Sequence, residues 1–96
     1  MHIIDMHCDT VLRCYLNKYS LAENPGHIDL AKLKQGGCLA QCFALFIPTH
    51  QAAEYDGITT EAYDTYKALL NEYHKALEDC KDSLRPALSA EDIRKN

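Results

Sequence analysis

The spacing of apolar and polar side chains at the start of the chain predicts a strand followed directly by a helix. Residues His2 to Cys8 alternate loosely between apolar and polar side chains, which suits a short strand. From Thr10 to Lys18 the apolar side chains recur at the spacing of one helical face, and these are Val11, Leu12, Tyr15 and Leu16. We therefore expect a strand-helix unit at the beginning of the chain.

The next segments predict a loop, a short helix and a second strand. Residues 19–26 are rich in turn-forming Ser, Asn, Pro and Gly, which favours a surface loop. Residues 29–35 fit one or two helical turns, which Gly36 and Gly37 would end because glycine accepts a left-handed backbone. Residues 38–47 are almost continuously apolar, as is typical of a parallel strand covered on both faces.

A long amphipathic helix is expected from Thr60 to Asp82. Its apolar stripe at helical spacing consists of Ala62, Tyr66, Leu69, Leu70, Tyr73, Leu77 and Cys80. Thr60 is suited to the N-cap, since its hydroxyl can accept a hydrogen bond from the first turn. Further along, Ser89 precedes Asp92 by three residues, which is the pattern of another helix start.

The order of these elements predicts an α/β fold. Strand, helix, loop, strand and helix follow one another as in an α/β barrel or a doubly wound sheet, where helical crossovers join parallel strands. The pattern alone leaves both architectures open.

The amino-acid composition argues against some classes of binding partner. The chain of 96 residues has 14 acidic residues against 10 Lys and Arg, and no basic stripe, so we expect no binding to nucleic acid. No apolar run approaches the roughly 20 residues of a membrane span, and the first residues do not resemble a signal peptide. These features predict a soluble, cytoplasmic protein whose partner is a small molecule or another protein.

The cysteines are expected to be free thiols. Their number is five, which is odd, and no CxxC pair occurs. Disulfides are rare in the cytoplasm. We expect most of them to be small buried side chains, namely Cys14, Cys38, Cys42 and Cys80.

Candidate chemistry lies at the end of the first expected strand. His7 and Asp9 are two residues apart, so both side chains should project to one side of a strand while Cys8 points away. An imidazole nitrogen and a carboxylate oxygen suit Zn²⁺, although a catalytic zinc uses about three protein ligands. The alternative is a hydrogen-bonded surface pair without a metal.

Three stretches of the sequence resemble the N-terminal third of the membrane dipeptidase (renal dipeptidase-like) family. They are Ile4-Asp5-Met6-His7-Cys8-Asp9-Thr10, the segment from Gly26-His27-Ile28-Asp29 to Gln35-Gly36-Gly37, and Gln41-Cys42-Phe43-Ala44. Their order and spacing match as well. The resemblance covers most of residues 2–48 and is only general in the later helices.

The resemblance implies a zinc-dependent dipeptidase. Members of that family are (β/α)8 TIM-type barrels that hold two bridged zinc ions and hydrolyse the peptide bond of dipeptides. His7 and Asp9 match the metal ligands of the first strand, and the metals would activate a bridging water. The remaining ligands and the acid/base residue fall on later strands, so no catalytic residue is expected within this chain.

On this basis residues 1–96 form a single partial domain, about two strand-helix units of an incomplete barrel that needs about 250 residues. We expect the isolated piece to be a poor or absent catalyst. The expected partners are a dipeptide substrate and, as an alternative left open, a second copy in a homodimer.

Other polar residues have weaker claims to the site. Asp5 could accept a hydrogen bond from the His7 ring, or it could be an exposed carboxylate. His27 and Asp29 repeat the His-x-Asp pattern, and they are expected to cap a short helix or fix a loop. His50 could contact substrate, although a solvated loop histidine is favoured.

Two other functions remain open. One is a different metal-dependent barrel amidohydrolase, such as an amidase or lactonase relative, because strand-one His-x-Asp ligands serve several reactions. The other is a non-catalytic fragment that acts as an assembly module through exposed strand edges.

Overall fold

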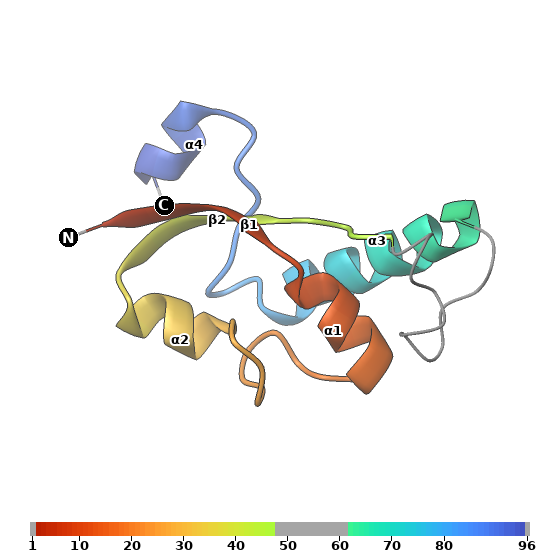
Figure 1. The fold of residues 1–96 in the computed structure, drawn as a ribbon. Coiled ribbons are helices and arrows are strands. Elements are labelled where there is room, and N and C mark those ends of the chain that lie inside the picture. The colour runs from red at the N-terminus through yellow and green to blue at the C-terminus, as the bar shows by residue number, and fades with distance from the viewer. Residues whose placement is uncertain (1, 48–61, 96) are drawn as a thin grey trace.

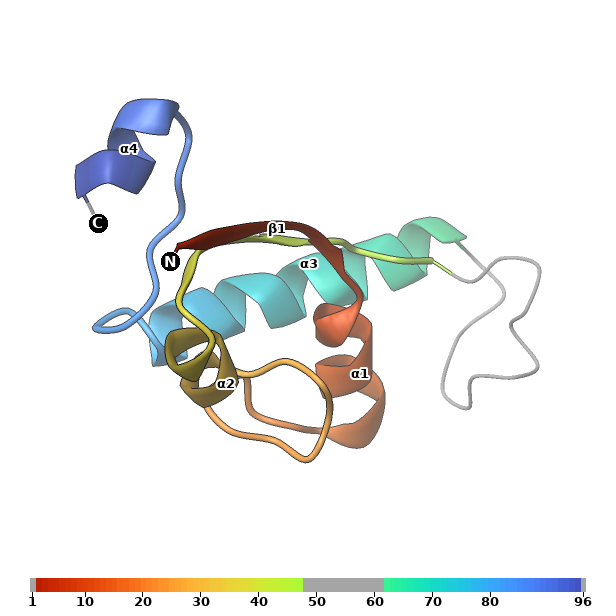
Figure 2. The same ribbon diagram turned by 60° about the vertical axis from the view of Figure 1, so that its left-hand side comes forward.

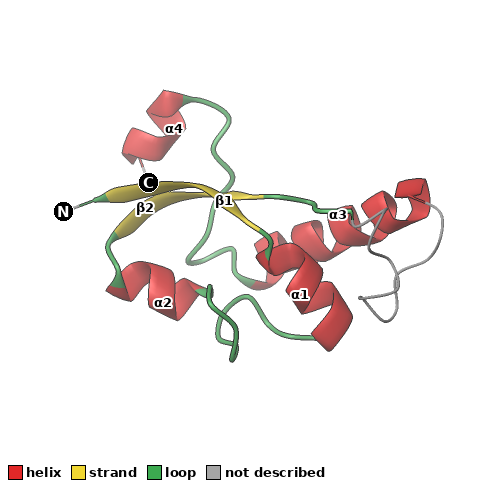
Figure 3. Ribbon diagram, in the orientation of Figure 1, coloured by secondary structure: helices red, strands yellow, loops and turns green. Residues whose placement is uncertain are grey.

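The computed structural model describes residues 2–47 and 62–95. Two strands and four helices follow one another in an α/β order (Figures 1 and 3). They are β1 (Ile3–Cys8), α1 (Thr10–Asn17), α2 (Leu30–Gln35), β2 (Cys38–Phe43), α3 (Ala62–Asp79) and α4 (Ala90–Lys95). The expected order of elements is confirmed for this part of the chain.

The two strands pair in parallel and form a two-stranded sheet. Helices α1, α2 and α3 lie on one side of this sheet, and α4 lies on the opposite side (Figures 1 and 2). We call the first side the helix-facing side and the other the open side. The parallel pairing agrees with the α/β expectation.

A small apolar core joins α1 to α3 on the helix-facing side. It is centred on Val11, Leu12 and Leu69, of which Leu69 is fully buried. Tyr15 and Leu16 pack against this cluster, so the stripe expected for the first helix is confirmed. Side chains of the second strand and its continuation add to it, namely Phe43, Leu45 and Ile47.

The second strand is less covered than its apolar sequence predicts. We expected both faces to be buried, yet Leu39 is 45% exposed and Cys42 is also exposed. This expectation is wrong for the described residues because α1, α2 and α3 cover one side of the sheet, while α4 on the other side leaves these two side chains exposed (Figure 2). Regular pairing also ends at Phe43, after which the backbone N–H of Ala44 still donates to the carbonyl of Cys8 at 2.9 Å.

Helix α3 faces the core along a narrower line than the expected stripe. Thr65 and Leu69 are its buried residues and lie four apart, so they share one face. Tyr66, which we placed on the apolar stripe, is 39% exposed, because it lies about one residue's rotation away from that line. The expected N-cap at Thr60 lies outside the described residues.

Polar side chains fix the ends of the shorter helices. Asp29 caps α2 by accepting a 2.7 Å hydrogen bond from the backbone N–H of Lys32. The helix ends at Gly36, and Gly37 has a φ of 75°, which suits glycine. At α4 the Ser89 hydroxyl accepts from the backbone N–H of Asp92, as the sequence predicts.

The cysteines are free, as expected, but they are not uniformly buried. Cys8 and Cys14 are buried, whereas Cys38 and Cys80 are half-buried and Cys42 is exposed. The expectation of burial is therefore wrong for Cys42, which stays exposed although α4 lies on the open side of the sheet. In the same part of the chain, no helix combines the length and apolarity needed to cross a membrane.

Candidate metal site at the end of β1

His7 and Asp9 lie at the junction of β1 and α1. His7 is the penultimate residue of the strand, and Asp9 is the one residue between the strand and the helix. Asp9 occupies the N-cap position of α1, yet its side chain makes no capping hydrogen bond. Its Oδ1 lies instead 2.9 Å from Nε2 of His7, so the structure brings the two residues together as their spacing predicts.

The donor atoms of this pair fit one metal ion. Zinc bonds to His nitrogen and carboxylate oxygen are about 2.0–2.1 Å long, so an ion can bond to two atoms separated by 2.9 Å. Both side chains are accessible, with 64% of His7 and 45% of Asp9 exposed. The metal-free alternative uses the same geometry, with a proton on Nε2 shared with the carboxylate.

The described residues supply only two ligands. Within residues 2–47 and 62–95, no group of three or more His, Cys, Asp or Glu side chains could hold a metal ion. A catalytic zinc takes about three protein ligands, so His7 and Asp9 amount to part of such a site.

A bulge in β1 determines the side on which His7 lies. Between the partner pairs Asp5–Gln41 and Cys8–Phe43, β1 advances three residues while β2 advances two. Gln41 and Phe43 alternate by two and so share a face of β2, and Phe43 packs on the core. Asp5 and Cys8 therefore face the helices, and Cys8 is buried as expected. Bulges are rare in parallel pairs, and bulges in general are over-represented next to active sites, where they redirect a side chain.

The bulge separates Asp5 from His7. In a regular strand, residues two apart share a face, and Asp5 would then lie on the same face as the His7 ring that it was expected to contact. Among the described residues its carboxylate instead accepts a 2.7 Å hydrogen bond from Nε2 of Gln41. Gln41 is a residue to which the sequence assigned no role, although it is the single polar side chain within the apolar run 38–47.

The second His-x-Asp pair has a structural role, as expected. Asp29 is 1% exposed and accepts hydrogen bonds from the backbone N–H groups of Asn24 at 2.9 Å and Lys32 at 2.7 Å. These bonds, with the Lys32 ammonium 3.2 Å away, lower the pKa of the carboxyl. His27 is exposed and belongs to the same loop. The carboxylate is therefore buried and bonded to the backbone of its own loop, which matches the expected structural role.

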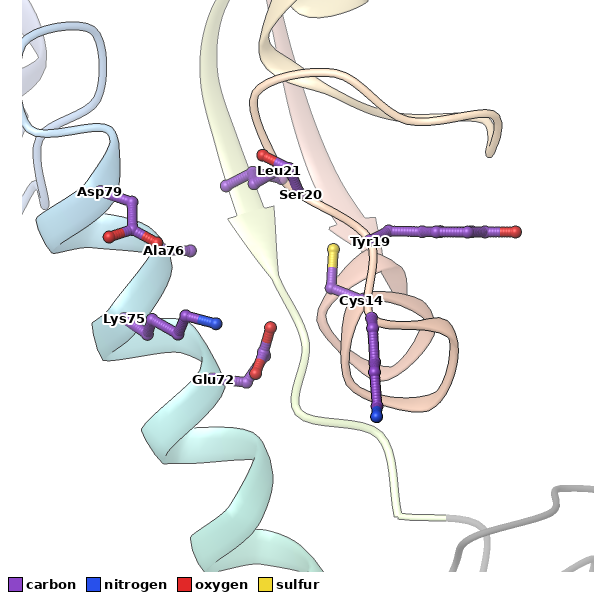
Figure 4. A pocket seen from close by; sticks show the side chains of 9 residues that line it. Cys14, Tyr19, Ser20, Leu21, Glu72, Lys75, Ala76 and Asp79 are labelled. Carbon is purple, nitrogen blue, oxygen red and sulfur yellow. The ribbon is translucent and has the colours of Figure 1, made fainter.

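A polar pocket lies between α1 and α3, away from this pair. Figure 4 shows the Cys14 thiol and the charged side chains of Glu72, Lys75 and Asp79 around it. Burial raises the pKa of Cys14 to about 11, and the negative charge of Glu72 adds to the effect. Cys14 in the second half of α1 and Lys18 at its end line the pocket, whereas Asp9 precedes the start of the helix, so the two sites are distinct.

The remaining histidines do not join the pair. His2 and His74 are exposed. His50 lies outside the described residues.

A comparison with protein-family models matches the whole chain, residues 1–96, to the membrane dipeptidase family (Peptidase family M19). The chain belongs to the membrane dipeptidase family. Comparisons with curated proteins and with solved structures gave no match. As a member of a peptidase family, the chain belongs among hydrolases that act on peptide substrates. The resemblance to membrane dipeptidases inferred from the sequence is confirmed.

Proposed function

We propose that His7 and Asp9 are zinc ligands of a dipeptidase that hydrolyses the peptide bond of dipeptides. Two observations together support this proposal. The chain matches the membrane dipeptidase family over residues 1–96. Its His-x-Asp pair at a strand end presents donor atoms 2.9 Å apart. When bound, zinc would polarise the scissile carbonyl and activate a water as nucleophile. The neutral imidazole of His7 and the carboxylate of Asp9 would hold the ion at the end of β1.

We further propose that the parallel β1–β2 pair forms about two strand-helix units of a (β/α)8 barrel. Active sites of such barrels lie at the carboxyl ends of the strands, and His7 is near the carboxyl end of β1. The complete site would contain two zinc ions and would take its other ligands from outside residues 1–96. Because the described residues offer two ligands, we expect residues 1–96 alone to be a poor or absent catalyst. Cytoplasmic location and homodimer formation stay predictions.

The test is metal content and dipeptide hydrolysis of the complete natural protein. We expect zinc to copurify, and His7→Ala to lose both zinc and hydrolysis. The matched control is His27→Ala, which removes the histidine of the other His-x-Asp pair, whose Asp29 binds backbone groups. A complete protein that contains no zinc and cleaves no dipeptide would refute the proposal, as would a fully active His7→Ala variant.

Two other functions give different results in simple assays. A related barrel amidohydrolase would bind zinc yet prefer amides or lactones without a free dipeptide backbone, so a substrate panel distinguishes it. An assembly module is favoured by the exposed apolar side chains of the strands, which include Ile4 (52% exposed), Met6 (75%) and Leu39 (45%). Light scattering of residues 1–96 measures this, since a monomeric solution would contradict assembly.

A further inference from the structure

A polar pair joins the two strands on the side where the rest of the packing is apolar. Asp5 and Gln41 are partners in the ladder, and Oδ2 of Asp5 accepts a 2.7 Å hydrogen bond from Nε2 of Gln41. Both residues are half-buried on the helix-facing side, next to Cys8 and Phe43. An apolar pair would satisfy burial at least as well, so packing alone does not account for these side chains.

Two hydrogen bonds orient the Gln41 amide, because Nε2 donates to Oδ2 of Asp5 at 2.7 Å and to the carbonyl of Cys42 at 3.1 Å. An ionised carboxylate only accepts hydrogen bonds, so Gln41 must present its NH₂ group to Asp5. The amide carbonyl is thereby turned inward, where Oε1 is buried and has no hydrogen-bond partner among the described residues. An unpaired buried acceptor is unfavourable, and most native proteins avoid it. The Gln41 side chain thus keeps its hydrogen bond to Asp5 although its carbonyl oxygen is left without a partner among the described residues.

The position of the pair explains why this bond matters. Asp5–Gln41 is the last partner pair before the bulge, and Cys8–Phe43 is the first pair after it. Between these pairs β1 has two residues, Met6 and His7, where β2 has only Cys42, so β1 carries one surplus residue. A shift of register by one residue would leave the Asp5 carboxylate without its donor, so the polar pair specifies where the bulge forms.

We propose that Gln41 is a positioning residue that, through its hydrogen bond to Asp5, holds the β1 bulge in place and sets the orientation of His7 toward Asp9. The effect on zinc affinity rests on the proposed function, whereas the effect on the His7 ring does not. Gln41 itself touches neither His7 nor Asp9 among the hydrogen bonds described, and it acts through the strand.

The first test uses metal-free complete protein and the ring resonances of its histidines in NMR spectra. Gln41→Met keeps the length of the side chain and removes the hydrogen bonds to Asp5 and to the Cys42 carbonyl, together with the unpaired carbonyl. We expect the His7 resonances to move while those of His27 and His74 stay. The control is Gln35→Met, at an exposed position of α2. Unchanged His7 resonances in a folded Gln41→Met variant overturn the proposal.

A second pair of variants guards against misfolding. Gln41→Glu places two carboxylates together and should disturb His7 at least as strongly as Gln41→Met. The double variant Asp5→Asn/Gln41→Glu reverses the polarity of the same hydrogen bond, since the new amide can donate to the new carboxylate. We expect it to return the His7 resonances toward those of the wild type. If Gln41→Met does not fold, this double variant decides, and failure to restore His7 counts against the proposal.

Zinc titration of the same proteins supplies the link to the metal site. Groups that orient metal ligands typically contribute about 10-fold or more to affinity, so we expect Gln41→Met to bind zinc about 10-fold more weakly. Wild-type protein that binds no zinc would overturn the proposed function, while the NMR test still reports on Gln41. Wild-type protein that binds zinc with the same affinity as Gln41→Met would instead overturn the positioning role.

Discussion

The backbone N–H of Asn24 donates a 2.9 Å hydrogen bond to Oδ2 of Asp29, and this bond closes the loop before α2. The Asn24 side chain completes the closure by donating to the carbonyls of Ser20 and Ile28. Lys32 adds a backbone N–H to Oδ1 of Asp29 and an ammonium group to the carbonyls of Asn24 and Gly26. The loop is therefore held by one buried carboxylate and its neighbours.

Acid should weaken this loop. The hydrogen bonds from Asn24 and Lys32 lower the pKa of Asp29 in the folded protein below its unfolded value of about 3.9. The stability that it contributes is present above that unfolded pKa and is lost as the pH falls through the folded pKa. We expect Asp29→Asn to be less stable at pH 7 and to approach the wild type in acid, as measured by urea unfolding at several pH values. Asp82→Asn, at an exposed position, is the control; curves of Asp29→Asn and wild type that stay parallel would contradict this role.

The two consecutive glycines after α2 should respond differently to alanine. Gly37 has a φ of 75°, which is unfavourable for an L-residue by roughly 1–2 kcal/mol. Gly36 has a φ of −80°, and a Cβ there would lie 3.4 Å from the Lys32 carbonyl oxygen. We expect Gly37→Ala to lower the free energy of unfolding by about 1 kcal/mol and Gly36→Ala to change it by less than about 0.5 kcal/mol. Equal effects in denaturant titrations would count against the left-handed backbone at Gly37.

The contact between α1 and α3 should depend on Leu69. This side chain is 0% exposed and packs against Val11 and Leu12. Leu69→Ala removes buried methyl groups and leaves a cavity, which lowers the free energy of unfolding by about 2–5 kcal/mol. Leu88→Ala is the matched control, because Leu88 is 92% exposed and should matter by no more than about 0.5 kcal/mol. Thermal unfolding followed by circular dichroism measures both, and similar melting temperatures would argue against this core.

The thiols should react in an order set by burial. Cys14 is buried and its pKa is raised to about 11, so at pH 8 it is almost entirely the unreactive thiol. Burial also raises the pKa of Cys8. We expect iodoacetamide at pH 8 to modify exposed Cys42 first and Cys8 and Cys14 last, as followed by peptide mass spectrometry. Rapid labelling of Cys14 in folded protein would contradict its packing between α1 and α3, and the same reaction in urea provides the control.

Periodicity was sufficient to predict the elements but not their exposure. The strand at the start, the helix from Thr10 and the long helix that contains Leu69 all follow from local spacing of apolar side chains. The exposure of Leu39, Cys42 and Tyr66 depends on which faces other elements cover, and local sequence contains no information about that.

In the candidate site, too, local sequence predicts some contacts and not others. The proximity of His7 and Asp9 follows from their spacing, and the capping by Asp29 follows from an acceptor placed before a helix. The partner of Asp5 could not be predicted in this way. It depends on how β1 and β2 align across 36 residues of sequence, and on a surplus residue that only the pairing reveals.

The bulge in β1 also has a consequence for how this segment can change over time. Asp5 and Cys8 pair with residues of β2 on the helix-facing side and are constrained by packing, whereas Met6 and His7 between them are exposed. Substitutions at Met6 and His7 can therefore alter the chemistry of the strand end without repacking the helices. During evolution, such substitutions can change the reaction performed at the end of β1 while the packing of the sheet on the helices is retained.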